Sequence, residues 1–375
     1  MSAAYPAKHD AVVTPGKRIP LHVIEVETVA PKAGEVVVRV EWTSSSPLDL
    51  HRADGGLLCT PLPFIIGSSF AGTVVATGPE DPAATKPISA PIQLNDKVFG
   101  LSEQEQKQQG FQTYVTVPRH ILGRIPPNLT IQEAITAPTN LVTAVHTVTK
   151  DLELELPWPR PEGWTPKQEH EPILIWGAAS SVGLFTVQVL QHWGYKNIIA
   201  VASARHHETL AGLGASKCFD YKEETVTDQI AAAVAAPIHL IVDCIGHLDG
   251  TLRPLTKLAV RDTKVAIMMP AILRDATDEH EPELSMDPST LLKGLWAEGV
   301  KLIGVRTFFY GRNEFLKWHL QTDIVPALLE SGVVKPNPTR IVEGATLVER
   351  AQNALDLLRQ RAPSGERLVW RVWEE

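Results

Sequence analysis

The chain has 375 residues, more than one hydrophobic core normally serves, so two domains are expected. Its hydrophobic fraction of 44% and charged fraction of 21% are those of an ordinary globular protein, and no run of about 18 apolar residues predicts a membrane span. The net charge of −8, without a Lys/Arg block interleaved with aromatic residues, gives no reason to expect a nucleic acid or an anionic membrane as partner.

The cysteines and the N-terminal residues indicate where the protein works. Cys59, Cys218 and Cys244 are far apart and match no C-x-x-C or zinc-ribbon spacing, so a disulfide framework is not expected. The first ten residues contain no apolar signal segment. A reducing, cytoplasmic location is the default expectation.

Residues 1–140 are predicted to form a β-rich domain. The strand-like runs are Glu35–Glu41, Gly72–Thr77, Lys97–Gly100 and Tyr114–Val117. Glycine and proline separate these runs, as is typical of a small barrel-like domain. Two stretches within it, Ser44–Arg52 and Pro63–Gly72, are candidate site segments.

The pattern becomes helical from Ala134 through Val148 and then changes sharply. The segment from Leu156 to Glu171 is crowded with prolines and can form neither a helix nor an inner strand. We therefore expect a surface insertion just before the strand that begins at Ile173. The second domain is expected to span residues 141–330.

A buried strand, a glycine turn and a helix follow, which is the first half of a dinucleotide-binding unit. Ile173–Trp176 is an unbroken apolar run, and the apolar spacing from Ser180 to Gly194 predicts a buried helix. Glycine at 177 lets the backbone approach a pyrophosphate, and glycine at 183 lets the helix lie close to the strand. The spacing departs from G-x-G-x-x-G, so a buried turn that binds no nucleotide remains the alternative.

The second strand, Asn197–Ser203, bears on which nucleotide is bound. An NAD-binding protein should present an Asp or Glu at the end of this strand for the ribose 2′-hydroxyl, and none stands here. Ser203 and Arg205 instead offer a hydroxyl and a cation to a 2′-phosphate, which favours NADPH over NADH. Arg205 as a solvated residue at a helix start is the alternative.

Strands and helices continue to alternate toward the C-terminus. The predicted elements are the helix His207–Leu213, a strand ending at Tyr221, the helix Val226–Ala235 and the strands His239–Cys244, Lys264–Met268 and Val300–Val305. This alternation predicts an α/β fold with a doubly wound parallel sheet and with ligands at the carboxyl ends of its strands. The acidic stretch Pro270–Pro288 is expected to be a solvated loop or a flap.

The last residues, 331–375, are expected to return to the first domain. They contain a helix near Val348–Arg361 and a final strand, Arg367–Val372.

The order of these parts resembles the medium-chain dehydrogenase/reductase superfamily. The residues that carry the resemblance are Phe70–Gly78, Asp96–Gly100, Trp176–Gly183, Leu213–Ala215 and Phe219–Tyr221. The resemblance implies a β-rich, GroES-like catalytic domain over residues 1–140 and a Rossmann NADPH-binding domain over 141–330.

Within this superfamily, the chain is more similar to the zinc-free branch. Zinc alcohol dehydrogenases carry Cys where Ser46 stands and Gly-His-Glu where Gly67-Ser68-Ser69 stands, and serine is a poor zinc ligand. The quinone oxidoreductase and enoyl reductase branch has Asn-Pro-x-Asp, of which Pro47 and Asp49 remain. The proline-rich insertion, the length and the ending Ser364–Val369 most resemble fungal trans-acting enoyl reductases of polyketide pathways.

The resemblance implies a reaction without metal, in which hydride passes from nicotinamide C4 to the β-carbon of an activated double bond. It places Ser46, Asp49, His51 and Thr143 as candidate catalytic residues. His51 is either a general acid, since an imidazole pKa near 6.5 suits that role, or a structural histidine.

The resemblance also implies where the nucleotide binds. Ser180, Ser181 and Val182 would contact the pyrophosphate, and Ser203, Arg205 and His206 the 2′-phosphate. Tyr221 would lie beside the adenine or would be a strand-end aromatic without that role. Ile245 and Met269 would border the nicotinamide ribose.

Three functions remain open. The first is a reductase of an enoyl thioester held on a carrier protein, with a polyketide synthase as partner. The second is a reductase of free enones or quinones, and the third is a non-catalytic NADPH-binding protein. A monomer and a dimer are both compatible with the sequence.

Overall fold

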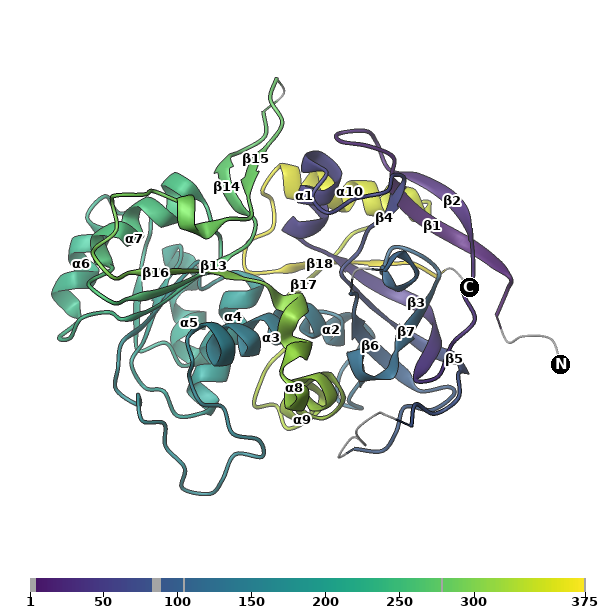
Figure 1. Ribbon diagram of the computed structural model, residues 1–375, viewed down its shortest axis with the longest axis horizontal. Helices are drawn as coiled ribbons and strands as arrows, with labels where there is room; N and C mark the ends of the chain where they lie inside the picture. The colour runs from purple at the N-terminus through teal and green to yellow at the C-terminus, as the bar shows by residue number, and fades with distance from the viewer. Residues whose placement is uncertain (1–4, 83–88, 104, 278, 374–375) are drawn as a thin grey trace. The chain divides into compact units, whose positions relative to one another are not determined.

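The computed structural model describes residues 5–82, 89–103, 105–277 and 279–373 (Figure 1). The chain groups into two compact units: unit 1 is Met1–Val142 with Phe308–Glu375, and unit 2 is Thr143–Thr307. Residues 308–330, which the sequence prediction placed in the Rossmann domain, therefore group with unit 1.

Unit 1 is built on two β-sheets. In the described residues, the larger sheet has the order β17-β18-β3-β5-β6-β8 with β7 paired to β3, and the smaller has the order β2-β1-β4. The strands are β1 (Lys8–Thr14), β2 (His22–Glu27), β3 (Glu35–Ser45), β4 (Phe64–Ile65), β5 (Ser69–Thr77), β6 (Lys97–Leu101), β7 (Tyr114–Pro118), β8 (Leu122–Arg124), β17 (Thr339–Ile341) and β18 (Arg367–Arg371). Because β18 pairs with β3, the C-terminal strand completes this unit.

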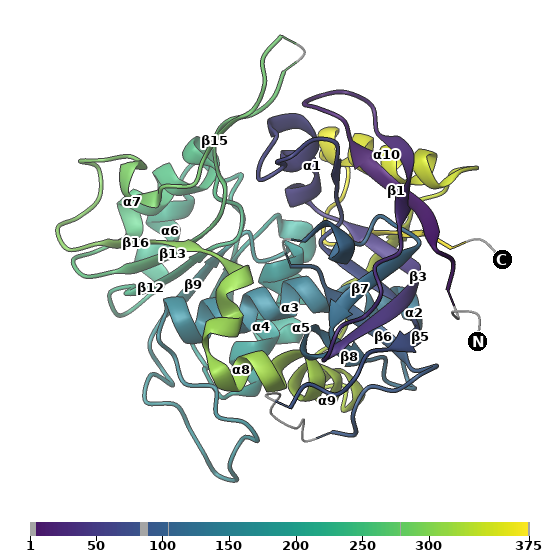
Figure 2. The same ribbon diagram turned by 45° about the vertical axis from the view of Figure 1, so that its right-hand side comes forward.

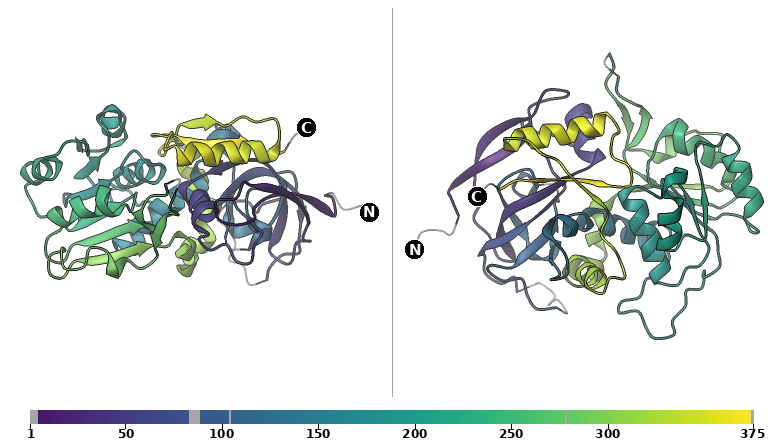
Figure 3. Two further views of the ribbon diagram at one scale, coloured as in Figure 1. Left: turned by 90° about the horizontal axis from the view of Figure 1, so that it is seen from above. Right: turned by 180° about the vertical axis from the view of Figure 1, so that it is seen from behind.

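The helices of unit 1 lie early and late in the chain. They are α1 (Pro47–Gly55), α2 (Ile131–Ala134), α8 (Glu314–His319), α9 (Val325–Glu330) and α10 (Leu347–Arg359). Helix α10 packs on α1, as the right-hand view of Figure 3 shows. The Arg359 guanidinium donates to both carboxylate oxygens of Asp54, at 2.9 and 2.7 Å, which fixes this contact between segments far apart in sequence.

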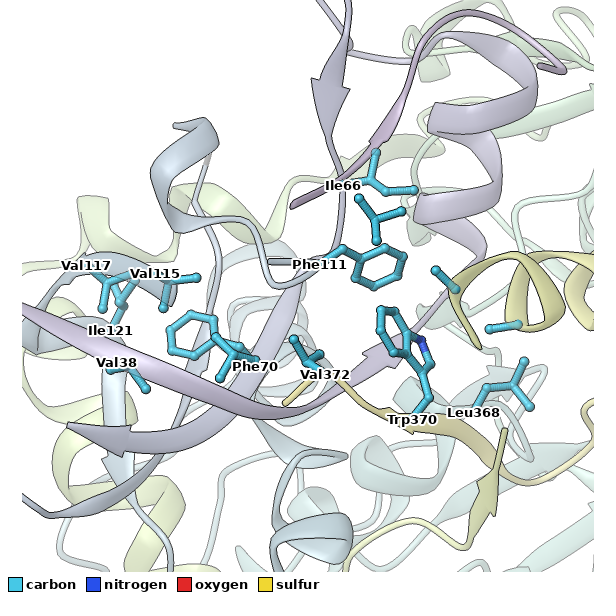
Figure 4. Packing of buried hydrophobic residues seen from close by; sticks show 14 of the residues in the cluster. Val38, Ile66, Phe70, Phe111, Val115, Val117, Ile121, Leu368, Trp370 and Val372 are labelled. Carbon is cyan, nitrogen blue, oxygen red and sulfur yellow. The ribbon is translucent and has the colours of Figure 1, made fainter. Parts of the chain in front are cut away.

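The hydrophobic core of unit 1 includes residues from both ends of the chain (Figure 4). The Phe111 and Trp370 rings meet edge to face, with centroids 4.6 Å apart. Ile66 and Leu368 belong to the same buried cluster. The final strand is therefore needed to close the core.

Unit 2 contains a six-stranded parallel sheet in the order β11-β10-β9-β12-β13-β16, counted over the described residues. Its strands are β9 (Ile173–Trp176), β10 (Ile198–Val201), β11 (Lys217–Phe219), β12 (Leu240–Asp243), β13 (Lys264–Met268) and β16 (Lys301–Val305). Its helices are α4 (Ser181–His192), α5 (His207–Leu213), α6 (Val226–Ala233) and α7 (Arg253–Leu258). This is the strand order of a Rossmann sheet, which confirms the predicted fold class.

Helix α3 (Ala137–His146) carries the chain from unit 1 into unit 2 and continues as a π-helical turn, Thr147–Asp151. The proline-rich segment beyond it forms neither helix nor strand, as predicted. Hydrogen bonds hold it in place: Trp193 Nε1 donates to the Pro157 carbonyl at 3.0 Å, and the Tyr195 hydroxyl donates to the Glu155 carbonyl at 3.1 Å.

The segment 270–288, expected to be a solvated loop or a flap, contains regular structure that the sequence prediction did not include. The segment forms a hairpin of β14 (Ala271–Arg274) and β15 (Glu283–Ser285), which stands away from the sheet of unit 2 in Figures 1 and 2. The apolar residues 271–273 supply one strand, and the acidic residues that follow obscured this signal. Two contacts fix the hairpin base: Ile272 N donates to Gly246 O at 2.7 Å, and His247 Nε2 lies 3.0 Å from Asp275 Oδ2.

Candidate functional site

The turn between β9 and α4 is shaped for a close-approaching ligand. Gly177 has φ of +76°, and a Cβ there would lie 2.6 Å from Ile245 Cγ1. A Cβ on Gly183 would lie 2.6 Å from the carbonyl oxygens of residues 177 and 178, so only glycine allows the helix to start this close to the strand. Ser180 caps α4 by accepting from Gly183 N at 3.1 Å. Ser181 and Val182 follow in the first turn, where backbone N–H groups and the helix dipole favour an anion.

A second turn, after β12, is held by the buried carboxylate of Asp243. One oxygen accepts from the backbone N–H groups of Ile245 and Gly246, both at 3.0 Å, and the other accepts from the Thr251 hydroxyl at 2.6 Å. Burial raises the pKa of Asp243, and these hydrogen bonds oppose the shift. The pattern Asp-x-x-Gly at the strand end was present in the sequence, but sequence reasoning missed this role.

Cys244 lies in the same turn and is not a nucleophile. Burial raises the pKa of its thiol, so the sulfur stays protonated at neutral pH.

Ile245 and Met269 follow β12 and β13, which are adjacent parallel strands. The two residues therefore lie at the carboxyl edge of the sheet, where ligands of doubly wound folds bind. Ile245 is 41% exposed, while Met269 is partly buried against the core of unit 2.

The turn after β10 contains the residues predicted to face a 2′-phosphate. Ser203 Oγ donates to the Tyr221 hydroxyl at 3.2 Å, and Arg205 and His206 belong to the short 3₁₀ turn that follows. Sequence reasoning missed Asp220, whose carboxylate accepts from Ala204 N at 3.1 Å. The Lys222 backbone N–H, also bound to this carboxylate, lowers the pKa of Asp220, so it is ionised beside the turn.

In unit 1, Ser46 and Asp49 are brought together at the start of α1. Ser46 donates to Asp49 Oδ2 through its backbone N–H, at 2.8 Å, and through its hydroxyl, at 2.9 Å. Gly67 N donates to Oδ1 at 3.1 Å. Burial raises the pKa of Asp49, while the charges of Arg52 and Arg367 act in the opposite direction.

The two other candidate catalytic residues, His51 and Thr143, lie in different units of the chain. His51 is half-buried on α1, two residues after Asp49, and helix geometry keeps residues at this spacing from facing each other. Thr143 belongs to unit 2, and its hydroxyl lies 2.9 Å from that of Thr307, at the other end of the same unit.

In the described ranges, no group of three or more His, Cys, Asp or Glu side chains is arranged to hold a metal ion. The described helices include none with the length and apolar character of a membrane span. The three cysteines are free thiols.

A Rossmann sheet with two glycine turns at its carboxyl edge, and a separate β-rich unit, define a class of nucleotide-dependent oxidoreductases. Comparisons with known proteins agree. Residues 32–143 match the alcohol dehydrogenase GroES-like domain family, and residues 181–305 match the zinc-binding dehydrogenase family. A putative zinc-dependent alcohol dehydrogenase from Rhizobium etli CFN 42 has a similar structure, with a TM-score of 0.74 at 21% identity, covering 99% of this chain and 100% of that one.

Curated relatives narrow the class. Trans-enoyl reductase himH of Aspergillus japonicus is 29% identical over 87% of this chain and 86% of its own length. Trans-enoyl reductase tazE of Aspergillus terreus is 30% identical over 69% and 83%. The enoyl reductase component lovC of the lovastatin nonaketide synthase, also from Aspergillus terreus, is 25% identical over 90% and 89%. The chain belongs to the medium-chain dehydrogenase/reductase superfamily, in the family of the fungal trans-enoyl reductases.

Proposed function

We propose that this protein is an NADPH-dependent reductase of an activated C=C bond in an enoyl thioester, a polyketide intermediate presented in trans by a partner synthase. The names of three relatives that cover most of the chain support the reaction class. The observation that carries the proposal is the pair of turns at Gly177–Gly183 and Asp243–Gly246. A Cβ on any of the three glycines Gly177, Gly183 and Gly246 would clash with neighbouring atoms, and the first turn leads into the N-terminus of α4, which favours an anion.

The residues of unit 2 fit a dinucleotide. When bound, the reduced nicotinamide supplies a hydride for the β-carbon of the substrate. Ser180, Ser181 and Val182, at the start of α4, bind the pyrophosphate. Ile245 follows β12 and Met269 follows β13, and these two residues border the nicotinamide ribose.

NADPH rather than NADH is the proposed cofactor. Ser203, Arg205 and His206 bind the 2′-phosphate, for which a guanidinium is a strong partner, and Tyr221 lies beside the adenine. Calorimetric titration with both nucleotides tests this: we expect tighter binding of NADPH. Equal affinities, or tighter binding of NADH, would contradict the assignment.

We also propose that the reaction needs no metal. Ser46 and Ser68 offer hydroxyl oxygens, which are weak zinc ligands compared with thiolate or imidazole. The Ser46 hydroxyl is moreover already engaged with Asp49. In unit 1, Ser46 and Asp49 shape the start of α1, and His51 protonates the enolate carbon; in unit 2, Thr143 contacts the substrate.

Turnover of an enoyl pantetheine thioester should exceed turnover of a small cyclic enone under the same conditions. The reverse preference would favour a reductase of free enones or quinones. Tight NADPH binding with no oxidation on either substrate would favour a non-catalytic protein. The free thiols are consistent with a cytoplasmic location, which we include in the proposal.

A further inference from the structure

Several buried side chains among the described residues of unit 1 have a donor without an acceptor. In the described part of the chain, the hydroxyls of Ser68 and Ser102, Nε of Arg52 and Nη2 of Arg367 are buried and make no hydrogen bond. Ser68 is 1% exposed and Ser102 is fully buried. A buried donor without a partner destabilises a fold, so these four donors need an explanation.

Hydrogen bonds show that Ser68 and Ser102 are neighbours. Ser102 N donates to the Ser68 carbonyl at 2.9 Å, because residues 68 and 102 continue the pairing of β5 with β6. Their hydroxyls are thus carried by adjacent backbone segments.

The guanidinium groups connect to the same two segments. Arg52 Nη1 donates to Gln109 Oε1 at 2.9 Å, and Gln109 Nε2 donates to the Glu103 carbonyl, next to Ser102, at 2.7 Å. Arg367 Nε donates to Ser44 Oγ at 3.2 Å, and Ser44 Oγ lies 2.7 Å from Ser69 Oγ, next to Ser68.

The charges of this region do not cancel. Two buried guanidinium groups, those of Arg52 and Arg367, act on one carboxylate, that of Asp49. Burial lowers the pKa of Arg367 to about 10, so it remains protonated at neutral pH. Asp49 offsets at most one of these two charges, so positive charge exceeds negative charge among these three buried groups. Such a region attracts an anionic oxygen.

We propose that the Ser68 and Ser102 hydroxyls form an oxyanion site, in which they donate to the carbonyl oxygen of the enoyl thioester as that oxygen becomes an enolate. This proposal rests on the proposed function and names the groups that would stabilise the negative charge on the enolate oxygen. Ser46 does not take this role, because its hydroxyl donates to Asp49.

The electron balance of the step is simple. Hydride adds to the β-carbon, the alkene electron pair shifts to the bond between the α-carbon and the carbonyl carbon, and the carbonyl pair moves to the oxygen. A proton then adds to the α-carbon, the carbonyl bond forms again and the oxygen loses its charge. The reduced nicotinamide is oxidised and the thioester is saturated. Donors aimed at this oxygen are most valuable while it is anionic.

Two variants, Ser68→Ala and Ser102→Ala, test the site, with Thr116→Val as matched control. Thr116 is a buried residue of β7 whose hydroxyl donates to the Val29 carbonyl. Each serine variant should lower kcat about 100-fold, as loss of one oxyanion donor does, with NADPH affinity unchanged. Its melting temperature should stay equal or rise, because no hydrogen bond is lost. Thr116→Val should show the opposite, an unchanged kcat and a lower melting temperature.

A binding experiment separates this site from the proposed function. Acetoacetyl pantetheine thioester, added with oxidised nucleotide, ionises to an enolate that absorbs in the near ultraviolet and requires no turnover. The wild-type protein should lower the pH at which this enolate forms, and each serine variant should lower it less. Equal enolate titrations for wild type and both variants would overturn the oxyanion site. If the wild type stabilises the enolate but reduces no enoyl thioester, the proposed function fails and the site stands.

Discussion

Two buried carboxylates of unit 2 differ in how well they are satisfied. Both oxygens of Asp243 accept hydrogen bonds. Asp151, which is 7% exposed, has in the described structure no partner for Oδ2, and burial raises its pKa to about 6. Asp243 therefore stabilises the turn after β12, whereas an ionised Asp151 lowers the free energy of unfolding.

Asp151→Asn should stabilise the protein at alkaline pH. Because the folded-state pKa is raised, the carboxyl group favours folding below its ordinary value of 3.8, and this contribution is lost as pH rises through about 6. We expect the variant to gain about 1–3 kcal/mol at pH 8, with a smaller gain near pH 4. Thermal unfolding at both pH values measures this, and equal melting temperatures at pH 8 would contradict it.

His146, on the helix leading to Asp151, has the opposite dependence. Burial lowers its pKa to about 4, so the contribution of the neutral imidazole to stability is present above pH 6.5 and is lost as pH falls. His146→Gln should reduce the loss of melting temperature at acidic pH, because this variant has no imidazole to protonate. Measuring its thermal unfolding beside that of Asp151→Asn therefore separates the effect of the histidine from that of the carboxyl group.

His51→Ala tests the proton donor. If the imidazole protonates the enolate carbon, kcat should fall about 100-fold or more while the Kd of NADPH stays constant. His22→Ala is a matched control, because His22 is an exposed histidine of unit 1 on β2. An unchanged rate for His51→Ala would remove His51 from the mechanism.

At the scale of elements, the approach of α4 to β9 depends on one glycine. Gly183→Ala would place a Cβ 2.6 Å from two carbonyl oxygens, so the helix must move outward. We expect a loss of about 1–3 kcal/mol in stability and weaker NADPH binding. Gly212→Ala, in α5 with open space around its Cβ, should instead stabilise the protein by up to about 1 kcal/mol. Similar effects of the two substitutions on unfolding and on NADPH binding would contradict this explanation.

The shape of the turn after β12 should depend on the carboxylate of Asp243. Asp243→Ala leaves the N–H groups of Ile245 and Gly246 without their acceptor, and the turn loses its shape. We expect NADPH affinity to fall about tenfold or more, and Thr251→Val, which removes one of the three hydrogen bonds, to have a smaller effect. Titration calorimetry measures both; a Thr251 variant as weak as Asp243→Ala would show that the hydroxyl, not the carboxylate, governs the turn.

Elements with strong local signals were predictable. β9, α5 and β13 occupy the predicted residues, because unbroken apolar runs and helical spacing follow from burial within single segments. β14 and β15 were missed, since each strand has only three or four residues and pairs across a charged turn. The hairpin of β1 and β2 was missed as well, because β2 alternates between exposed and partly buried residues and gives little hydrophobic signal.

At the scale of the whole molecule, the chain leaves unit 1 at residue 142 and returns to it at 308. Long-range partners created by this return could not be predicted: Arg367 acts on Asp49, and Trp370 packs on Phe111, only because β18 pairs with β3. The candidate residues in the turns of unit 2 could be predicted from the sequence, because these turns come directly after predicted strands. The orphaned hydroxyls of Ser68 and Ser102 were not, since a missing hydrogen bond leaves no trace in a sequence.

The most direct test of the proposed function follows one hydrogen atom. NADPH deuterated at nicotinamide C4, prepared separately on each face, is incubated with the protein and an enoyl pantetheine thioester, and the product is examined by mass spectrometry. The account predicts a saturated thioester that carries one deuterium at its β-carbon with one of the two cofactors. An unreduced thioester, or a saturated product without deuterium at the β-carbon from either cofactor, would contradict it.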